Sequence, residues 1–123
     1  MLDSGALVAL ERNDRAMWCR LKDAALTAQP PLSHGGVIGQ VWRGRGSRHA
    51  LLARALQGIE VAPLDAERGR AAGELVGRAR QKDVIDAAVI LLANDGDTVV
   101  TSDPDDLVPL AEASGIHLEL VAV

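Results

Sequence analysis

No Lys or Arg follows Lys82 in this chain of 123 residues. All thirteen basic side chains, with eight acids, precede residue 83, and nine acids without a base follow Lys82. Such segregation in one small chain indicates either two surfaces of opposite sign or one cleft lined by both. A basic surface can hold phosphate groups, and an acidic surface can hold a metal ion.

Several other features are scarce. The chain has two Trp but no Phe or Tyr, so Leu, Val and Ala must fill the core. The single cysteine, Cys19, excludes an intrachain disulfide and a Cys-based zinc site. Neither a signal peptide nor an apolar run of roughly 18–20 residues is present, which favours a cytoplasmic protein outside the membrane. The length predicts a single domain, residues 1–123.

Short β-branched runs alternate with helical patterns along the chain. We expect strands at residues 1–2, 32–33, 59–62, 98–101 and 117–123, and helices at 6–11, 15–28, 35–44, 49–56, 66–80, 84–93 and 107–114. Gly58 is expected to end the fourth helix in a left-handed conformation, and Pro109 to lie in the first turn of the last helix. Strands alternating with helices predict an α/β fold, a three-layer α/β/α sandwich with a central, mostly parallel sheet.

The segment from Asp83 to Asp106 contains seven aspartates and no basic residue. Asp83 and Asp86 are three positions apart in the first turn of an apolar helix and share a face. The strand at 98–101 delivers Asp103 to the carboxyl edge of a sheet, where function gathers in open α/β sheets. Carboxylates that converge without basic partners need a counter-charge, and a divalent metal ion is the obvious one.

The same acids also suit helix capping. Asp83 is a good N-cap with Asp86 at the third helical position, and Asp103 is a good N-cap with Pro104 and Asp106 following it. Asp3, which follows the first strand, can cap the next helix in the same way. Capping and metal binding do not exclude each other, so both interpretations stay open.

The expected positions of Asp3, Asp86 and Asp103 suit metal-assisted hydrolysis. Each lies where a parallel sheet exposes its carboxyl edge, although the three are far apart in sequence. Mg²⁺ takes a few carboxylates, retains several waters and uses substrate phosphate for its remaining ligands. It lowers the pKa of a bound water and stabilises the charge that develops on phosphate, which suits phosphodiester hydrolysis.

Four segments together resemble the PIN-domain family, and within it the VapC toxins of VapBC toxin–antitoxin pairs. They are LDSGALVAL, GQVWRG, DVIDAAVILLA and DTVVTSDPDDL, in that order, and they span essentially the whole chain. The resemblance implies a PIN-like α/β/α sandwich and an endoribonuclease that depends on Mg²⁺ or Mn²⁺. It also implies a type II toxin with a VapB-type antitoxin as partner, RNA as substrate and a homodimer.

Matched to the family's motifs, Asp3, Asp86 and Asp103 are the expected catalytic metal ligands. Asp106 matches a further acid that binds or supports the metal, and Asp83 is a weaker supporting position. The sequence departs from the family at Gln40, where the family usually has Glu before V-W-R. An amide can ligate a cation through its oxygen, but it brings no charge and cannot act as a base.

Alternatives remain at two levels. Arg43, Arg45 and Arg48 either hold RNA phosphate or lie on a solvated face. Because of Gln40, the protein could instead be a PIN module that binds antitoxin or RNA without cleaving. An unrelated α/β phosphotransfer domain would need a late Lys opposite its acids, and no base follows Lys82.

Overall fold

The computed structural model describes all residues, Met1–Val123, as a mixed α/β fold of seven helices and four short strands. The helices are α1 Ser4–Glu11, α2 Arg15–Leu26, α3 Gly35–Val41, α4 His49–Leu56, α5 Ala66–Ala79, α6 Val84–Leu92 and α7 Pro104–Ser114. The strands are β1 Leu32–His34, β2 Glu60–Ala62, β3 Thr98–Thr101 and β4 Glu119–Ala122. None of the helices has the length and apolar character that crossing a membrane requires.

The strands form two parallel pairs, β1 with β2 and β3 with β4. The segment Met1–Asp3 runs between the pairs and bonds to both. Leu2 donates its N–H to the Leu32 carbonyl at 2.9 Å and bridges Val100 in parallel. Asp3 therefore emerges where the two pairs approach each other. The predicted parallel pairing is confirmed. The predicted single central sheet is not seen, because the four strands form two separate two-stranded sheets.

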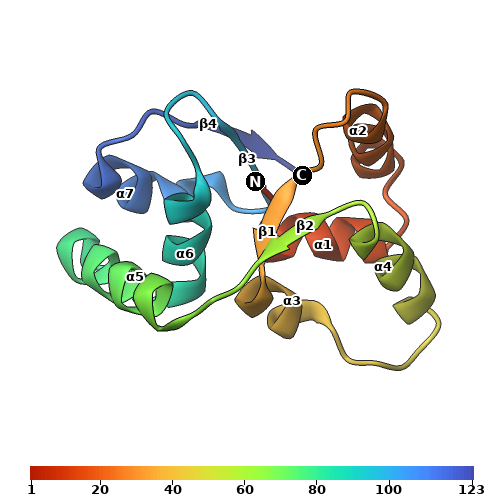
Figure 1. Ribbon diagram of the computed structural model, residues 1–123, viewed down its shortest axis with the longest axis horizontal. Helices are drawn as coiled ribbons and strands as arrows, with labels where there is room; N and C mark the ends of the chain where they lie inside the picture. The colour runs from red at the N-terminus through yellow and green to blue at the C-terminus, as the bar shows by residue number, and fades with distance from the viewer.

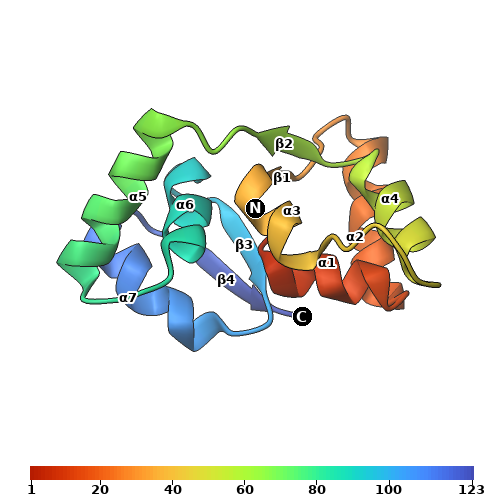
Figure 2. The same cartoon turned by 90° about the horizontal axis from the view of Figure 1, so that it is seen from below.

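Helices lie on both sides of the strands. Figures 1 and 2 place α1, α2 and α4 on one side and α5, α6 and α7 on the other. Helices α5, α6 and α7 contact one another, while α1 contacts α3 and α4. The Met1–Asp3 segment leads directly into α1, and β3 is followed by α7.

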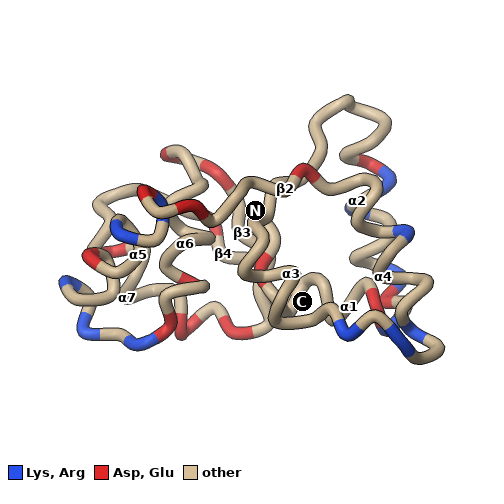
Figure 3. Tube along the Cα trace, turned by 60° about the horizontal axis from the view of Figure 1, so that its bottom comes forward, with Lys and Arg blue, Asp and Glu red and all other residues tan.

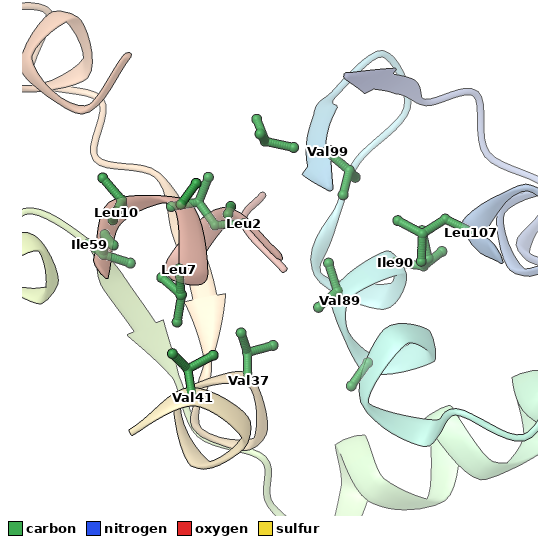
Figure 4. Close-up of a cluster of buried hydrophobic side chains, with 14 of the residues drawn as sticks. Leu2, Leu7, Leu10, Val37, Val41, Ile59, Val89, Ile90, Val99 and Leu107 are labelled. Carbon is green, nitrogen blue, oxygen red and sulfur yellow. The ribbon is translucent and has the colours of Figure 1, made fainter. Parts of the chain in front are cut away.

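One cluster of 22 buried residues forms the core and includes residues from both groups of helices. Figure 4 shows Leu7 and Val37 in one part of it, and Ile90 and Leu107 in the other. All members are aliphatic except Met17, and the two Trp side chains are only partly buried at the edge of the cluster. The prediction of a core without aromatic residues is confirmed.

Several predicted boundaries were wrong for local reasons. Helix α7 begins at Pro104, so Pro109 lies inside it and not in its first turn. Gly58 has no positive φ; α4 ends at Leu56, and the left-handed glycine that ends a helix is Gly115, with φ 77°. Helix α3 stops at Val41 because Trp42 is extended. A two-glycine start made the longer helix plausible from sequence, but it gave no information about where the helix ends.

Three helices end in a non-glycine residue with left-handed backbone. These residues are Asn13 after α1 (φ 61°), Ala28 after α2 (φ 53°) and Arg80 after α5 (φ 54°). In each case the next N–H bonds back five residues, giving Asp14 to Ala9, Gln29 to Ala24 and Gln81 to Val76 at 2.9, 3.0 and 3.1 Å. This is the Schellman ending, in which glycine is the usual residue because a Cβ is disfavoured there.

Candidate functional site

Asp3 is a buried carboxylate at the start of α1. Its side chain is 5% exposed, and its Oδ1 accepts a hydrogen bond from the Ala6 N–H at 3.1 Å. The predicted capping role is therefore confirmed. Burial raises the pKa of Asp3, and the nearby Asp103 raises it further. A carboxylate that is costly to ionise at the junction of the strands is a position that a cation would stabilise.

Gly5 lets α1 approach the segment after β3 closely. A Cβ built on Gly5 would lie 2.7 Å from the backbone nitrogen of Ser102 and would also collide with the Ser102 side chain. Real Cβ atoms do not come this close to backbone. Because Gly5 has no side chain, α1 can contact Ser102 closely. This contact brings the segment that contains Asp3 near the segment that contains Asp103.

Asp86 lies in the first turn of α6 and is only partly exposed. Asp83 is the N-cap, and its Oδ1 accepts from the N–H groups of Ile85 and Asp86 at 2.9 and 3.1 Å. Burial, followed by repulsion from the four other aspartates of the site, raises the pKa of Asp86 to about 6. The capping prediction for Asp83 is confirmed, while the Asp86 carboxylate takes no part in capping.

Asp103 stands at the N-cap position of α7 with Pro104 as the first helical residue, as predicted, but its side chain makes no capping bond. Its backbone N–H instead donates to the buried Thr101 hydroxyl at 3.0 Å. Asp106, one turn on, has its pKa raised first by Asp103. The Asp103 carboxylate therefore makes no hydrogen bond to the N-terminus of α7.

Five carboxylates from separate parts of the chain thus act on one another. We call them the aspartate group: Asp3, Asp83, Asp86, Asp103 and Asp106. No Lys or Arg forms an ion pair with any of them, since the structure's one ion pair joins His117 to Asp95 at 3.3 Å. Folding therefore brings the five predicted aspartates within electrostatic reach of one another, and none of them has a Lys or Arg as an ion-pair partner.

The donor chemistry of the aspartate group fits a hard divalent cation. All donors are carboxylate oxygens, which Mg²⁺ and Mn²⁺ prefer, and Cys and His are absent from the group. The side chains are not arranged as a closed set of three or more metal ligands. The observation in favour of a cation is electrostatic: four neighbouring acids raise the pKa of Asp86.

His34 fixes the position of α6 against β1. It is 1% exposed; its Nδ1 accepts from the Gly36 N–H at 3.0 Å, and its Nε2 lies 3.1 Å from the Ile85 carbonyl oxygen. These partners require the neutral ring with the proton on Nε2, and burial lowers the pKa of His34 in agreement. Because Ile85 precedes Asp86, this partly buried bond ties the backbone next to Asp86 to β1.

A pocket of about 300 Å³ opens beside part of the aspartate group, and we call it the aspartate pocket. Its lining residues are Arg80, Gln81, Lys82, Asp83, Asp86, Asp106 and Leu110. The largest pocket, about 470 Å³, lies along α1 and contains Ser4 and Ser102 but none of the five carboxylates. The smaller pocket is the one that concerns the chemistry, because charged groups converge there.

The other predicted positions are placed differently. The Arg43 guanidinium donates to the carbonyls of Gly39, Gln40 and Trp42 at 3.2, 3.1 and 2.9 Å, so it caps the end of α3. Gln40 is exposed in the last turn of that helix, and its side chain makes no hydrogen bond. Arg45 and Arg48 are exposed between α3 and α4. None of these four lines the aspartate pocket.

Sequence reasoning missed four residues that contribute to the site. His34 was treated as a surface or core residue without a role, because no second His or Cys stands at ligand spacing from it. Gly5 gave no signal beyond a turn before the first helix. Arg80 and Lys82 counted only as basic residues, although their place just before Asp83 already tied them to the start of α6.

Comparison with known proteins assigns no family. The chain matches none of the models of known protein families, and no curated protein matches it either.

Proposed function

We propose that this protein is a metal-dependent endoribonuclease of the PIN type. The observation that carries the proposal is the aspartate group, in which carboxylates distant in sequence share one electrostatic environment and raise the pKa of Asp86 to about 6. Acids held together without basic partners are costly unless a cation binds them. Three of the four sequence segments that resemble PIN domains contain all five of these acids.

The corresponding fold is a three-layer sandwich around one parallel sheet. In this proposal Met1–Asp3 is the central strand, flanked by β1 with β2 on one side and by β3 with β4 on the other. Support comes from the hydrogen bonds of Leu2 to Leu32 and of Asp3 to Val100, at 2.9 and 3.3 Å. The helices on both sides of the strands are consistent with the two outer layers (Figure 2).

Asp3, Asp86 and Asp103 are the residues that would hold Mg²⁺ or Mn²⁺, with Asp106 and Asp83 in support. When bound, such an ion supplies charge neutralisation at phosphate and a lowered pKa for water. The chain's own contribution is orientation. His34 fixes Asp86, Gly5 brings the Asp3 and Asp103 segments together, and Thr101 anchors the Asp103 backbone.

The biological setting follows from the resemblance. A VapC-like toxin is paired with a VapB-type antitoxin and forms a homodimer, and we extend both properties to this chain as part of the proposal. The exposed Gln40 favours a second candidate, a PIN module that binds RNA or antitoxin without cleaving. Its amide leaves α3 without an acid to contribute to the aspartate group.

RNA cleavage separates the two candidates. Purified protein is incubated with a structured RNA and Mn²⁺, beside Asp86→Asn and the matched control Asp105→Asn. Asp105 is exposed on α7 next to Asp106 and does not contribute to the raised pKa of Asp86. We expect cleavage by the wild type and the control, and a loss of at least about 100-fold in Asp86→Asn. RNA binding without cleavage by the wild type would establish the second candidate.

A further inference from the structure

The loop between α5 and α6 gives the aspartate pocket a basic rim. Arg80 and Lys82 line this pocket together with Asp83, Asp86 and Asp106. Figure 3 shows the basic end of α5 running directly into the acidic start of α6. The pocket is therefore the bipolar cleft that the segregated charge of the sequence allowed as one of two possibilities.

The cations of this rim are not engaged by the acids that share the pocket. Neither Arg80 nor Lys82 forms an ion pair with an aspartate, and both side chains are exposed. Arg80 and Lys82 are thus free to contact an anion, and the carboxylates are free to bind a cation.

The backbone at Arg80 determines where the basic rim lies. Arg80 ends α5 with φ 54° and ψ 40°, in the Schellman position where glycine is the favoured residue. The left-handed turn directs the chain from α5 into α6 and places Arg80 and Lys82 on the rim of the pocket.

We propose that Arg80 and Lys82 bind a backbone phosphate of a single RNA strand whose adjacent phosphodiester faces the aspartate group. The inference rests on the proposed function and names the part of the substrate that this side of the pocket takes. A guanidinium matches phosphate through two parallel hydrogen bonds, and an ammonium adds a point charge. The attraction of these two cations for a phosphate offsets part of the repulsion that a polyanion meets from the five carboxylates.

The test compares variants of the rim with matched controls elsewhere. Arg80→Gly removes the side chain and relieves the left-handed backbone, so misfolding cannot explain a loss. Lys82→Ala removes the second cation. Ala28→Gly relieves the same kind of helix ending on α2, away from the pocket, and Arg78→Ala removes an exposed cation of α5 that does not line it.

Two readouts are measured on the full chain with a fluorescein-labelled single-stranded RNA and Mn²⁺. Cleavage gives kcat and KM; anisotropy in an Asp103→Asn background, which blocks cleavage without altering the pocket lining, gives Kd. For Arg80→Gly we expect KM and Kd to rise about tenfold and kcat to change less than about threefold. Its thermal midpoint should equal or exceed that of the wild type, and the salt dependence of Kd should weaken.

The outcomes separate this inference from the proposed function. Normal cleavage with an unchanged KM in Arg80→Gly would refute phosphate binding by the basic rim, while the proposed nuclease activity would stand. No cleavage by the wild type, together with RNA binding that depends on Arg80 and Lys82, overturns hydrolysis and supports the rim. Equal losses in Arg78→Ala, or no RNA binding by the Asp103→Asn protein, also overturn it.

Discussion

At the scale of one residue, the raised pKa of Asp86 shows that placing five acids near one another costs stability. Its carboxyl has a pKa of about 6 in the folded protein against an ordinary value of 3.8. Between these values the folded state holds the proton that the unfolded state releases. The contribution of this group to stability therefore falls as pH rises through that window and is fully lost above it.

Asp86→Asn should accordingly stabilise the fold, while we expect it to abolish the proposed RNA cleavage. In EDTA at pH 8 we expect unfolding by urea to cost about 1–2 kcal/mol more than for the wild type, below the full shift because water screens the partly exposed site. The gain should vanish well below the ordinary pKa of 3.8, where the wild-type carboxyl is protonated in both states. A variant less stable than the wild type at pH 8 would contradict the electrostatic account.

Gly5→Ala tests the close approach that joins the Asp3 and Asp103 segments. The added Cβ meets the Ser102 backbone at 2.7 Å, so α1 must move, and we expect a loss of about 1–3 kcal/mol in unfolding free energy. Gly73→Ala is the matched control. It places a methyl group in open space on α5, where Ala stabilises a helix by about 0.5–1 kcal/mol over Gly. Equal effects of the two substitutions on urea unfolding would refute the contact.

At the scale of elements, the junction of β1, α3 and α6 depends on one buried imidazole. His34→Asn keeps an acceptor for the Gly36 N–H but cannot reach the Ile85 carbonyl. His34→Gln keeps a donor at the position of Nε2. If the Ile85 bond positions α6, His34→Gln should cost about 1 kcal/mol and His34→Asn about 2–3 kcal/mol in unfolding free energy.

Hydrogen exchange at α6 distinguishes positioning from general stability. We expect the amides of Ile85 and Asp86, which bond to the Asp83 carboxylate, to exchange faster in His34→Asn than in His34→Gln. Uniform acceleration over all helices in both variants would show that His34 only fills space in the core.

Local patterns predicted the elements well where side chains decide them, and less well where distant contacts do. The strand Thr98–Thr101 and the helix His49–Leu56 lie where their apolar spacing indicated. Pro109 was misplaced because a proline within a helix is unfavourable and was expected to start one. The left-handed Arg80 had no sequence signal at all, since the usual mark of such an ending is glycine.

At the scale of the whole molecule, the site is a product of parallel pairing. Asp3 follows a segment that bridges β3, so it lies near Asp103 at the same end of the strands, and Asp86 approaches both from the first turn of α6. The sequence predicted this convergence because strand order places carboxyl ends together. It could not predict the basic rim, whose position depends on how α5 turns into α6.

Binding of Mn²⁺ tests the shared cation site most directly, and paramagnetic resonance of free Mn²⁺ measures it without reference to RNA. We predict that Asp86→Asn and Asp103→Asn each weaken Mn²⁺ binding by about tenfold or more, while Asp105→Asn binds as the wild type does. Equal Mn²⁺ affinity in all four proteins, or no measurable binding by the wild type, would contradict the central claim that separate aspartates form one site.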